Sequence, residues 1–207
     1  SEELLAKTYG VSRLTVRQAI ASLVEEGLVY RKRGKGSFVT ELRIEQKLSH
    51  LTSFTEEMAQ RGLTASAQVL SAATVKAEPQ IAEKLKLVER GVDSLFQINR
   101  LRYADGKEVA FEEVYIPGDL YPDLLREDLT DSINALLEKQ GISMDFAEQV
   151  IAAGLPGRIV ASHLKITPNT PVLKMSRVYL QRDGLAIQYV NSIFRADRYQ
   201  LISILKR

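Results

Sequence analysis

VSRLTVRQAIASLVEEGLVYRKRGKGSF, residues 11–38, decides the fold of the N-terminal part of this chain. The short helical segment before it stops at Tyr9-Gly10, where glycine can take the positive φ of a helix C-terminus without steric cost. Ser12 is a favourable N-cap for a second helix. Apolar residues recur at helical spacing in this second helix and are expected to form its packed face: Leu14, Ala19, Ile20, Leu23 and Val24.

A basic hairpin is expected to follow the second helix. Gly27 ends that helix, and two apolar runs, 28–30 and 37–39, then flank the glycine-rich segment RKRGKG at 31–36. Two short β-rich runs around such a segment indicate a hairpin with a basic tip. A helix-turn-helix followed by this hairpin is typical of a winged helix-turn-helix, which places one helix in the DNA major groove.

Three polar residues, Arg13, Thr15 and Arg17, fall in the first turns of the second helix. A recognition helix offers these positions to base edges, and arginine can form paired hydrogen bonds to guanine. A merely solvated basic face is the alternative, but the Gly-x-Ser turn, the arginines and the basic hairpin coincide. The distribution of charge supports the DNA-binding interpretation. Residues 1–40 carry 7 Lys+Arg and 4 Asp+Glu, whereas residues 41–207 carry 21 Lys+Arg and 22 Asp+Glu. The basic excess lies where phosphate contacts are needed.

The rest of the chain mixes strands and helices. Residues 41–49 contain no glycine or proline and are predicted to be an extended segment that pairs with another strand. Asp105-Gly106 and Asp183-Gly184 each join two β-rich runs, and Asp-Gly is a hairpin turn. Helices are expected from the capping box at Ser53 to Gly62, and at 79–85, 132–139 and 157–164, with further strands at 67–75 and 144–152. The class is therefore α+β with a mainly antiparallel sheet.

Arg100 and Arg102 are the residues of this part that point to chemistry. They lie two apart on a predicted strand, so both face one side. Like charges repel unless an anion or carboxylates lie between them, and guanidinium groups suit phosphate well. Glu112 on the paired strand could form an ion pair with one of these arginines. A cross-strand salt bridge on a solvent-exposed face therefore stays open as an alternative. Ser53 and Ser132 each begin a predicted helix, and helix N-termini favour anions.

Several function classes have no support in the sequence. There are no cysteines, so no disulfide, thiolate metal site or thiol nucleophile is expected. His50 and His163 are the only histidines and lack an accompanying base or nucleophile pattern, so structural roles are expected for both. We expect no catalytic residue, no cofactor and no metal. Without a long apolar run or a signal peptide, a soluble cytoplasmic protein is the simplest expectation.

Residues 1–39 resemble the DNA-binding head of the GntR family of bacterial transcription regulators. Ser-Arg-x-Thr-Val-Arg-x-Ala at 12–19 matches the family's recognition helix, and the segment 33–39, RGKGSFV, matches its wing. Family heads usually have another helix before the Ser1-Glu2 pair, so the resemblance implies that the first helix is absent from residues 1–40. It also implies the DNA contacts: Ser12, Arg13, Thr15, Arg17, Lys35 and Gly36.

The later segments resemble the UTRA effector domain of the HutC subfamily. The matches are 51–56, Arg100-x-Arg102, Glu112-x-x-Tyr-Ile-Pro, Ser132-Ile133 and 194–199. UTRA has a fold similar to chorismate lyase and is implied to bind small molecules, often sugar phosphates. By position, the anion would be held by Ser53, Arg100, Arg102 and Ser132, and the pocket completed by Glu112, Asn134, Gln188 and Phe194. Amino-sugar-phosphate sensors have tyrosine, glutamate and tyrosine at the last three positions, so an amino sugar is not assumed here.

We therefore predict a winged helix-turn-helix at 1–40, a linker at 41–49, and a UTRA effector-binding and dimerisation domain at 50–207. The predicted function is a DNA-binding transcription regulator, a repressor by resemblance. A small anionic metabolite, with a sugar phosphate as the expected class, would control its binding to double-stranded operator DNA. We expect a homodimer, because two heads double the base contacts on a palindrome.

Two alternatives stay open. One is an enzyme of chorismate-lyase-like fold with an appended head, but an enzyme has no need of a recognition helix. The other is a DNA-binding protein whose body only dimerises, but a pure dimer interface gains little from clustered arginines.

Overall fold

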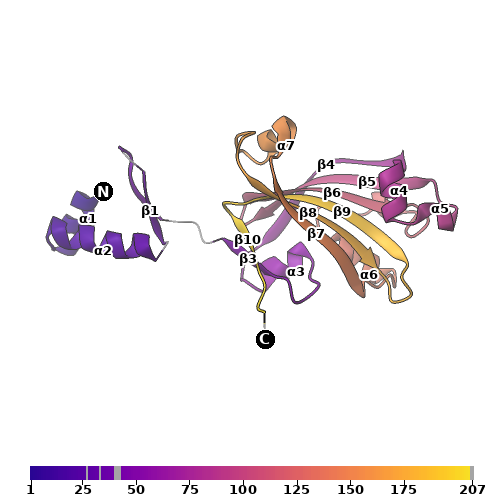
Figure 1. Cartoon of the computed structure of the whole chain (residues 1–207), viewed down its shortest axis with the longest axis horizontal. Helices are drawn as coiled ribbons and strands as arrows, with labels where there is room; N and C mark the ends of the chain where they lie inside the picture. The colour runs from indigo at the N-terminus through magenta and orange to yellow at the C-terminus, as the bar shows by residue number, and fades with distance from the viewer. Residues whose placement is uncertain (27, 33, 40–42, 206–207) are drawn as a thin grey trace. The chain divides into compact units, whose positions relative to one another are not determined.

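The computed structural model describes residues 1–26, 28–32, 34–39 and 43–205 (Figure 1). These residues divide into two compact units, Ser1–Ile44 and Glu45–Arg207. Each unit has its own secondary structure and is described by itself.

The first unit is a helix-turn-helix followed by a hairpin. Its elements are α1 (Glu2–Tyr9), α2 (Arg13–Glu25), β1 (Val29–Lys32) and β2 (Gly36–Val39). Gly10 ends α1 with φ 64°, and the Ser12 side chain caps α2 by accepting a hydrogen bond from the Thr15 amide. β1 and β2 pair antiparallel, and the rings of Tyr30 and Phe38 stack across them. The turn, the caps and the hairpin are as the sequence predicts, while the predicted helix end at Gly27 lies outside the described residues.

The packed face of α2 differs from the prediction. Val16 and Ile20 are the buried residues of this helix, whereas Leu14 is 64% exposed and Ala19 and Leu23 are also exposed. Positions 16 and 20 are one helical turn apart and share a face, but position 14 lies on the opposite side of the helix. The spacing of apolar residues predicted a wider buried face on α2 than the other elements of this unit cover.

The second unit is built on a six-stranded antiparallel sheet in the order β4-β5-β6-β9-β8-β7 (Figure 1). Its strands are β4 (Ala65–Lys76), β5 (Ser94–Ala104), β6 (Lys107–Pro117), β7 (Phe146–Gly154), β8 (Val172–Leu180) and β9 (Ala186–Arg195). Asp105 and Gly106 both have positive φ, 46° and 73°, as the tight β5–β6 hairpin requires. The predicted antiparallel hairpins are therefore confirmed, and the class is α+β.

A separate two-stranded sheet pairs β3 (Ile44–Lys47) with β10 (Tyr199–Ile202). The prediction that the segment 41–49 is extended and pairs with a strand is confirmed for 44–47, while residues 41 and 42 lie outside the described part. The partner strand β10 is too short to show a pattern in sequence.

Helices lie on both faces of the large sheet. They are α3 (Phe54–Ala59), α4 (Pro79–Lys84), α5 (Leu87–Arg90), the 3₁₀ turn η1 (Leu124–Arg126), α6 (Ile133–Lys139) and α7 (Gly157–His163). Successive residues of β5 point to opposite faces, so Leu95 packs with Leu87 of α5, whereas Ile98 packs with Ile133 and Leu137 of α6. Figure 1 shows α3 and α6 below the strands.

This alternation fixes where the arginines of β5 point. Arg100 and Arg102 continue the series that starts with Phe96 and Ile98, so they face the side that carries α3 and α6. None of the helices within the described ranges is long and apolar enough to cross a bilayer.

Candidate functional site

The candidate DNA-binding residues lie together in the first unit. Arg13 and Arg17 are exposed and one helical turn apart on α2, so they share a face. The Thr15 hydroxyl is 2.9 Å from the Ser12 hydroxyl, which ties both side chains to the helix cap. Arg17 is 58% exposed at its side chain and forms an ion pair of 3.2 Å with Glu2 of α1.

The hairpin presents the two remaining candidates at its turn. The Lys35 amide donates to the Lys32 carbonyl, and Gly36 opens β2 with φ 111°. A residue with a side chain rarely adopts that conformation, so glycine is needed there. Arg33, also part of the predicted basic tip, lies outside the described residues.

A pocket in the second unit gathers most of the predicted effector residues. It spans about 300 Å³, part of which is open to solvent, and lies between β5, β6, β8, β9, α3 and α6. Seven of the eight predicted side chains line it: Ser53, Arg100, Arg102, Glu112, Ser132, Asn134 and Gln188. These come from segments up to 135 positions apart, which the sheet order brings together.

Arg100 already uses all three of its guanidinium nitrogens as donors inside the protein. Its Nε and one terminal nitrogen donate to the Glu112 carboxylate, and its other terminal nitrogen donates to the carbonyls of Leu129 and Asp131. The pair with Glu112 is the cross-strand salt bridge that the sequence left open, but both partners are largely buried rather than on a wet face. Burial alone would raise the pKa of Glu112, but the guanidinium groups of Arg100 and Arg102 outweigh it and hold the pKa below its usual value.

Arg102 is the exception among the arginines of this pocket. It is only 3% exposed, yet among the described residues it makes one hydrogen bond, to the Thr55 hydroxyl at 3.1 Å, and lies over the face of the Phe54 ring at 4.7 Å. Its Nε is buried and has no hydrogen-bond partner among the described residues. Burial lowers the pKa of Arg102 to about 10, and the nearby Glu112 opposes this shift. The side chain is therefore a buried cation that lacks an anion of its own.

Ser53 and Ser132 are N-caps, as predicted. The Ser53 hydroxyl and amide both donate to the Glu56 carboxylate, and the Ser53 hydroxyl oxygen accepts from the Glu56 amide, which makes a complete capping box. The Ser132 oxygen accepts a hydrogen bond from the Ala135 amide at 3.2 Å. Because Ser132 uses only its acceptor in this contact, its hydroxyl hydrogen is available to a ligand.

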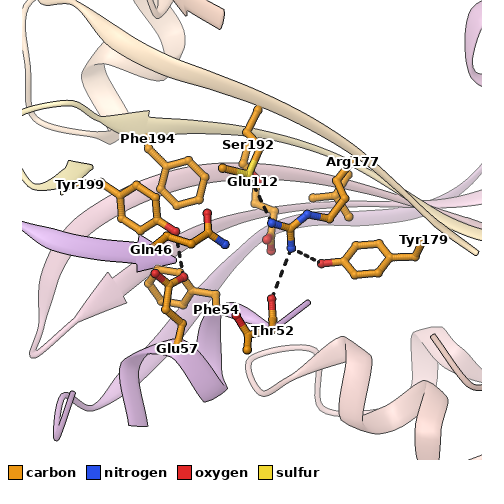
Figure 2. Close-up of a pocket in the computed structure, with 12 residues that line it drawn as sticks. Gln46, Thr52, Phe54, Glu57, Glu112, Arg177, Tyr179, Ser192, Phe194 and Tyr199 are labelled. Carbon is orange, nitrogen blue, oxygen red and sulfur yellow. Dashed lines mark hydrogen bonds between the residues drawn. The ribbon is translucent and has the colours of Figure 1, made fainter. Parts of the chain in front are cut away.

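The remaining predicted lining residues divide between two adjacent pockets. Asn134 and Gln188 lie in the first, where the buried Gln188 Oε1 has no hydrogen-bond partner among the described residues. Phe194 lines instead a second pocket, which spans about 370 Å³ including space open to solvent, and its ring stacks on Tyr199 at 4.0 Å between centroids (Figure 2). Both pockets share four lining residues: Phe54, Glu112, Tyr179 and Val190.

Several lining residues were missed by the sequence reasoning. Arg177 and Tyr179 lie on β8, Gln46 on β3 and Glu57 on α3, and all four line the second pocket (Figure 2). Arg177 and Tyr179 lie two apart on a predicted strand and share a face, but they do not form the pair of like charges that singled out Arg100 and Arg102. No local pattern marks Gln46 or Glu57.

Comparison with known proteins agrees with both halves of this description. Residues 1–39 match the family model described as "Bacterial regulatory proteins, gntR family", and residues 60–200 match the UTRA domain. This chain belongs to the GntR family. It is a transcription regulator with a DNA-binding head and a UTRA effector domain, which is the arrangement of the HutC subfamily.

Two curated relatives span nearly the same length. The chain is 33% identical to the transcriptional repressor NagR of Bacillus subtilis, over 100% of this chain and 85% of NagR. It is 32% identical to MngR of Escherichia coli, the mannosyl-D-glycerate transport/metabolism system repressor, over 100% of this chain and 86% of MngR. These relatives are transcription regulators, which supports the regulator hypothesis over the enzyme alternative.

A solved structure shares the architecture. The crystal structure of PhnF from Mycobacterium smegmatis aligns with a TM-score of 0.76 at 30% identity, covering 100% of this chain and 90% of PhnF.

Proposed function

We propose that this regulator is a repressor whose operator binding is controlled by a small anionic metabolite, with a sugar phosphate as the expected class. The anion would lie in the first pocket against Arg102. The observation that carries this proposal is the buried guanidinium of Arg102 with an unpartnered Nε. A buried charge without a partner is costly, and an anion in the pocket would remove that cost.

The roles of the two arginines differ in this proposal. Arg102 and the Ser132 hydroxyl would donate directly to the anion. Arg100, whose three guanidinium nitrogens each donate to a protein acceptor, would hold Glu112 and the 129–131 segment in place around the pocket. The first pocket then carries two guanidinium groups against one carboxylate, a net positive charge that favours an anion.

A thermal-shift screen tests the proposal directly. A bound effector at about 100 times its Kd should stabilise the folded chain by about 2.7 kcal/mol, which is several degrees for a chain of this size. The panel should contain inorganic phosphate, hexose phosphates and a carboxylated sugar, because the name of MngR refers to mannosyl-D-glycerate. Neutral sugars and matched sodium chloride serve as controls. If no anion raises the melting temperature above the chloride control, the proposal is wrong.

We also propose that the chain acts as a homodimer held together by its second unit. One head offers few base contacts, and a two-fold pair would read both halves of a palindrome. Sedimentation equilibrium should give twice the chain mass of 23.2 kDa at micromolar concentration, and the isolated segment 45–207 should behave in the same way. A monomeric full chain at that concentration would contradict the dimer. A dimeric full chain with a monomeric segment would move the interface to the head.

A further inference from the structure

Glu57 is a buried carboxyl group of the second pocket that is hydrogen-bonded through only one of its oxygens. It lies on α3 and is 3% exposed. Its Oε2 atom accepts a hydrogen bond from the Tyr199 hydroxyl of β10 at 2.8 Å, whereas its Oε1 atom is buried and has no hydrogen-bond partner among the described residues. A guanidinium nitrogen of Arg61 is 3.7 Å from Oε1, which is too far for a hydrogen bond. Oε1 of Glu57 therefore lacks a donor.

Gln46 of β3 presents a second acceptor of the same kind. It is buried, and its Oε1 atom also has no hydrogen-bond partner within the described part of the chain. Gln46 and Glu57 line the same pocket and lie close together in Figure 2. Two oxygen acceptors cannot bond each other unless one of them carries a hydrogen. A proton on Oε1 of Glu57 would supply it, because the neutral carboxyl can donate to Gln46 while Oε2 still accepts from Tyr199.

The surroundings of Glu57 favour this proton. Burial raises the pKa of Glu57 and outweighs the hydrogen bond from Tyr199 and the charges of Arg61 and Arg177, all of which lower the pKa. The side chain of Arg61 is 24% exposed, so solvent screens its charge. Burial and the nearby Glu57 also raise the pKa of Tyr199, so its hydroxyl stays a donor.

The other groups of this pocket do not neutralise Glu57. Arg177 of β8 uses its guanidinium nitrogens on other groups of the protein. Glu112 of β6 is a further carboxylate of the pocket, and it is ion-paired with Arg100. The other side chains that β3, α3, β8 and β9 contribute to the pocket carry no charge: Gln46, Phe54, Met175, Tyr179, Val190, Ser192 and Phe194.

We propose that Glu57 binds a proton and that the protonated carboxyl links α3 to β3 through Gln46 and to β10 through Tyr199, so that operator binding depends on pH. β3 begins at Ile44, the last residue of the first unit, and pairs with β10. The strand pair that Glu57 holds therefore contains the segment that continues into the head. Loss of the proton leaves two acceptors without a donor and removes the link from α3 to β3. This inference goes beyond the proposed function, because the proton acts whether or not an anion is bound.

The stability of the full chain gives the first test. Because the folded chain binds this proton more tightly than the unfolded chain, the proton stabilises the fold. This contribution is fully present below the ordinary pKa of glutamate and is lost as the pH rises through the raised pKa of Glu57. Glu57→Gln mimics the protonated group, since its amide can donate to Gln46 and accept from Tyr199. Over this pH range, the midpoint of urea unfolding should fall further in wild type than in Glu57→Gln, and an equal fall in both overturns the inference.

Carbon-13 NMR of labelled glutamate carboxyl groups detects the proton directly. One carboxyl should titrate at higher pH than the exposed glutamates, and its signal should be missing in Glu57→Gln. Tyr199→Phe removes a donor that favours the ionised form, so it should move this titration to still higher pH. Titration of Glu57 at or below the ordinary pKa of glutamate would mean that the Gln46 amide donates to an ionised carboxylate, which overturns the inference.

Proton exchange on DNA binding tests the coupling to the head. A duplex selected by the protein from a random pool serves as the operator. Isothermal titration in buffers of different ionisation enthalpy counts the protons taken up or released on binding. Since coupling is reciprocal, the parent protein should exchange a fraction of one proton in the pH range given above, and Glu57→Gln should exchange less. Histidine ordinarily titrates in a neighbouring range, so all proteins in this test carry His50→Gln and His163→Gln.

Glu45→Gln is the matched control, because it removes an exposed carboxylate from the same strand as Gln46 without entering the pocket. It keeps an acceptor for Gln200 and should exchange as many protons as the parent. Equal exchange in the parent and in Glu57→Gln overturns the coupling, even where NMR finds the proton. None of these measurements contains an effector, so a failed anion screen does not affect them.

Discussion

Arg102→Met should abolish the response of operator binding to the effector while leaving effector-free operator binding nearly intact. Methionine keeps most of the volume of the buried stem but removes a guanidinium whose buried Nε has no hydrogen-bond partner in the described part of the chain. Arg100 is a poor replacement, because each of its guanidinium nitrogens already donates to Glu112 or to a backbone carbonyl. The variant lies in the second unit, so the residues proposed to meet DNA are unchanged.

The expected size of this effect follows from linkage. Coupling between two sites is usually ~1–3 kcal/mol, which changes operator affinity several-fold to about a hundredfold. The coupling is reciprocal, so operator DNA must change effector affinity by the same factor. Titrating the selected duplex with and without effector, for wild type and for Arg102→Met, measures it from both directions. A response that survives in Arg102→Met would mean that the anion binds elsewhere.

The same substitution should stabilise the effector-free protein. Burial lowers the pKa of Arg102 to about 10 in the folded chain, below its ordinary value, so folding disfavours its charged form. That penalty is fully present below about pH 10 and disappears only as the pH rises through the higher ordinary pKa of arginine, so it acts at neutral pH. Replacing a buried charge with an apolar side chain should then add ~1–3 kcal/mol to the free energy of unfolding. A lower melting temperature in Arg102→Met would indicate a structural role for this arginine.

Local signals explain what the sequence predicted well. The Gly10 turn, the caps at Ser12, Ser53 and Ser132, and the Asp105-Gly106 hairpin each depend on residues within a few positions of one another. The interactions that form these features lie within a short stretch of sequence, and the structure confirms each of them. The same holds for the shared face of Arg100 and Arg102, which follows from the period of a strand.

The missed features depend on contacts between distant segments. Gln46, Glu57, Arg177 and Tyr199 meet in one compartment because β3 pairs with β10 beside α3 and β8. No window of sequence contains that pairing. The buried face of α2 was misplaced for a related reason, since the burial of Val16 depends on where the partner elements lie. The partner of Arg100, a bound ligand or a carboxylate of the protein, likewise depends on the register between β5 and β6. This register sets Arg100 opposite Glu112.

A second large effect is expected in the head, where Arg17→Ala should weaken specific operator binding by roughly 1–3 kcal/mol and relax base preference at one position. In the free protein, Arg17 is paired with Glu2, but this ion pair is exposed. Exposed pairs are worth about 0–1 kcal/mol, so Arg17 can leave Glu2 for a guanine edge at little cost. Glu2→Gln should therefore change operator affinity far less than Arg17→Ala does.

Lys35→Ala provides the contrast that separates base reading from phosphate contact. Lys35 lies at the turn of the β1–β2 hairpin and is proposed to meet the DNA backbone. Its loss should weaken binding to the selected operator and to scrambled duplexes by similar factors, and reduce the slope of log affinity against log salt by about 1. Fluorescence anisotropy with both duplexes at two salt concentrations distinguishes the variants. If Arg17→Ala leaves the ratio of operator to scrambled affinity unchanged, Arg17 meets phosphate as well, and base reading must come from Arg13 or Thr15.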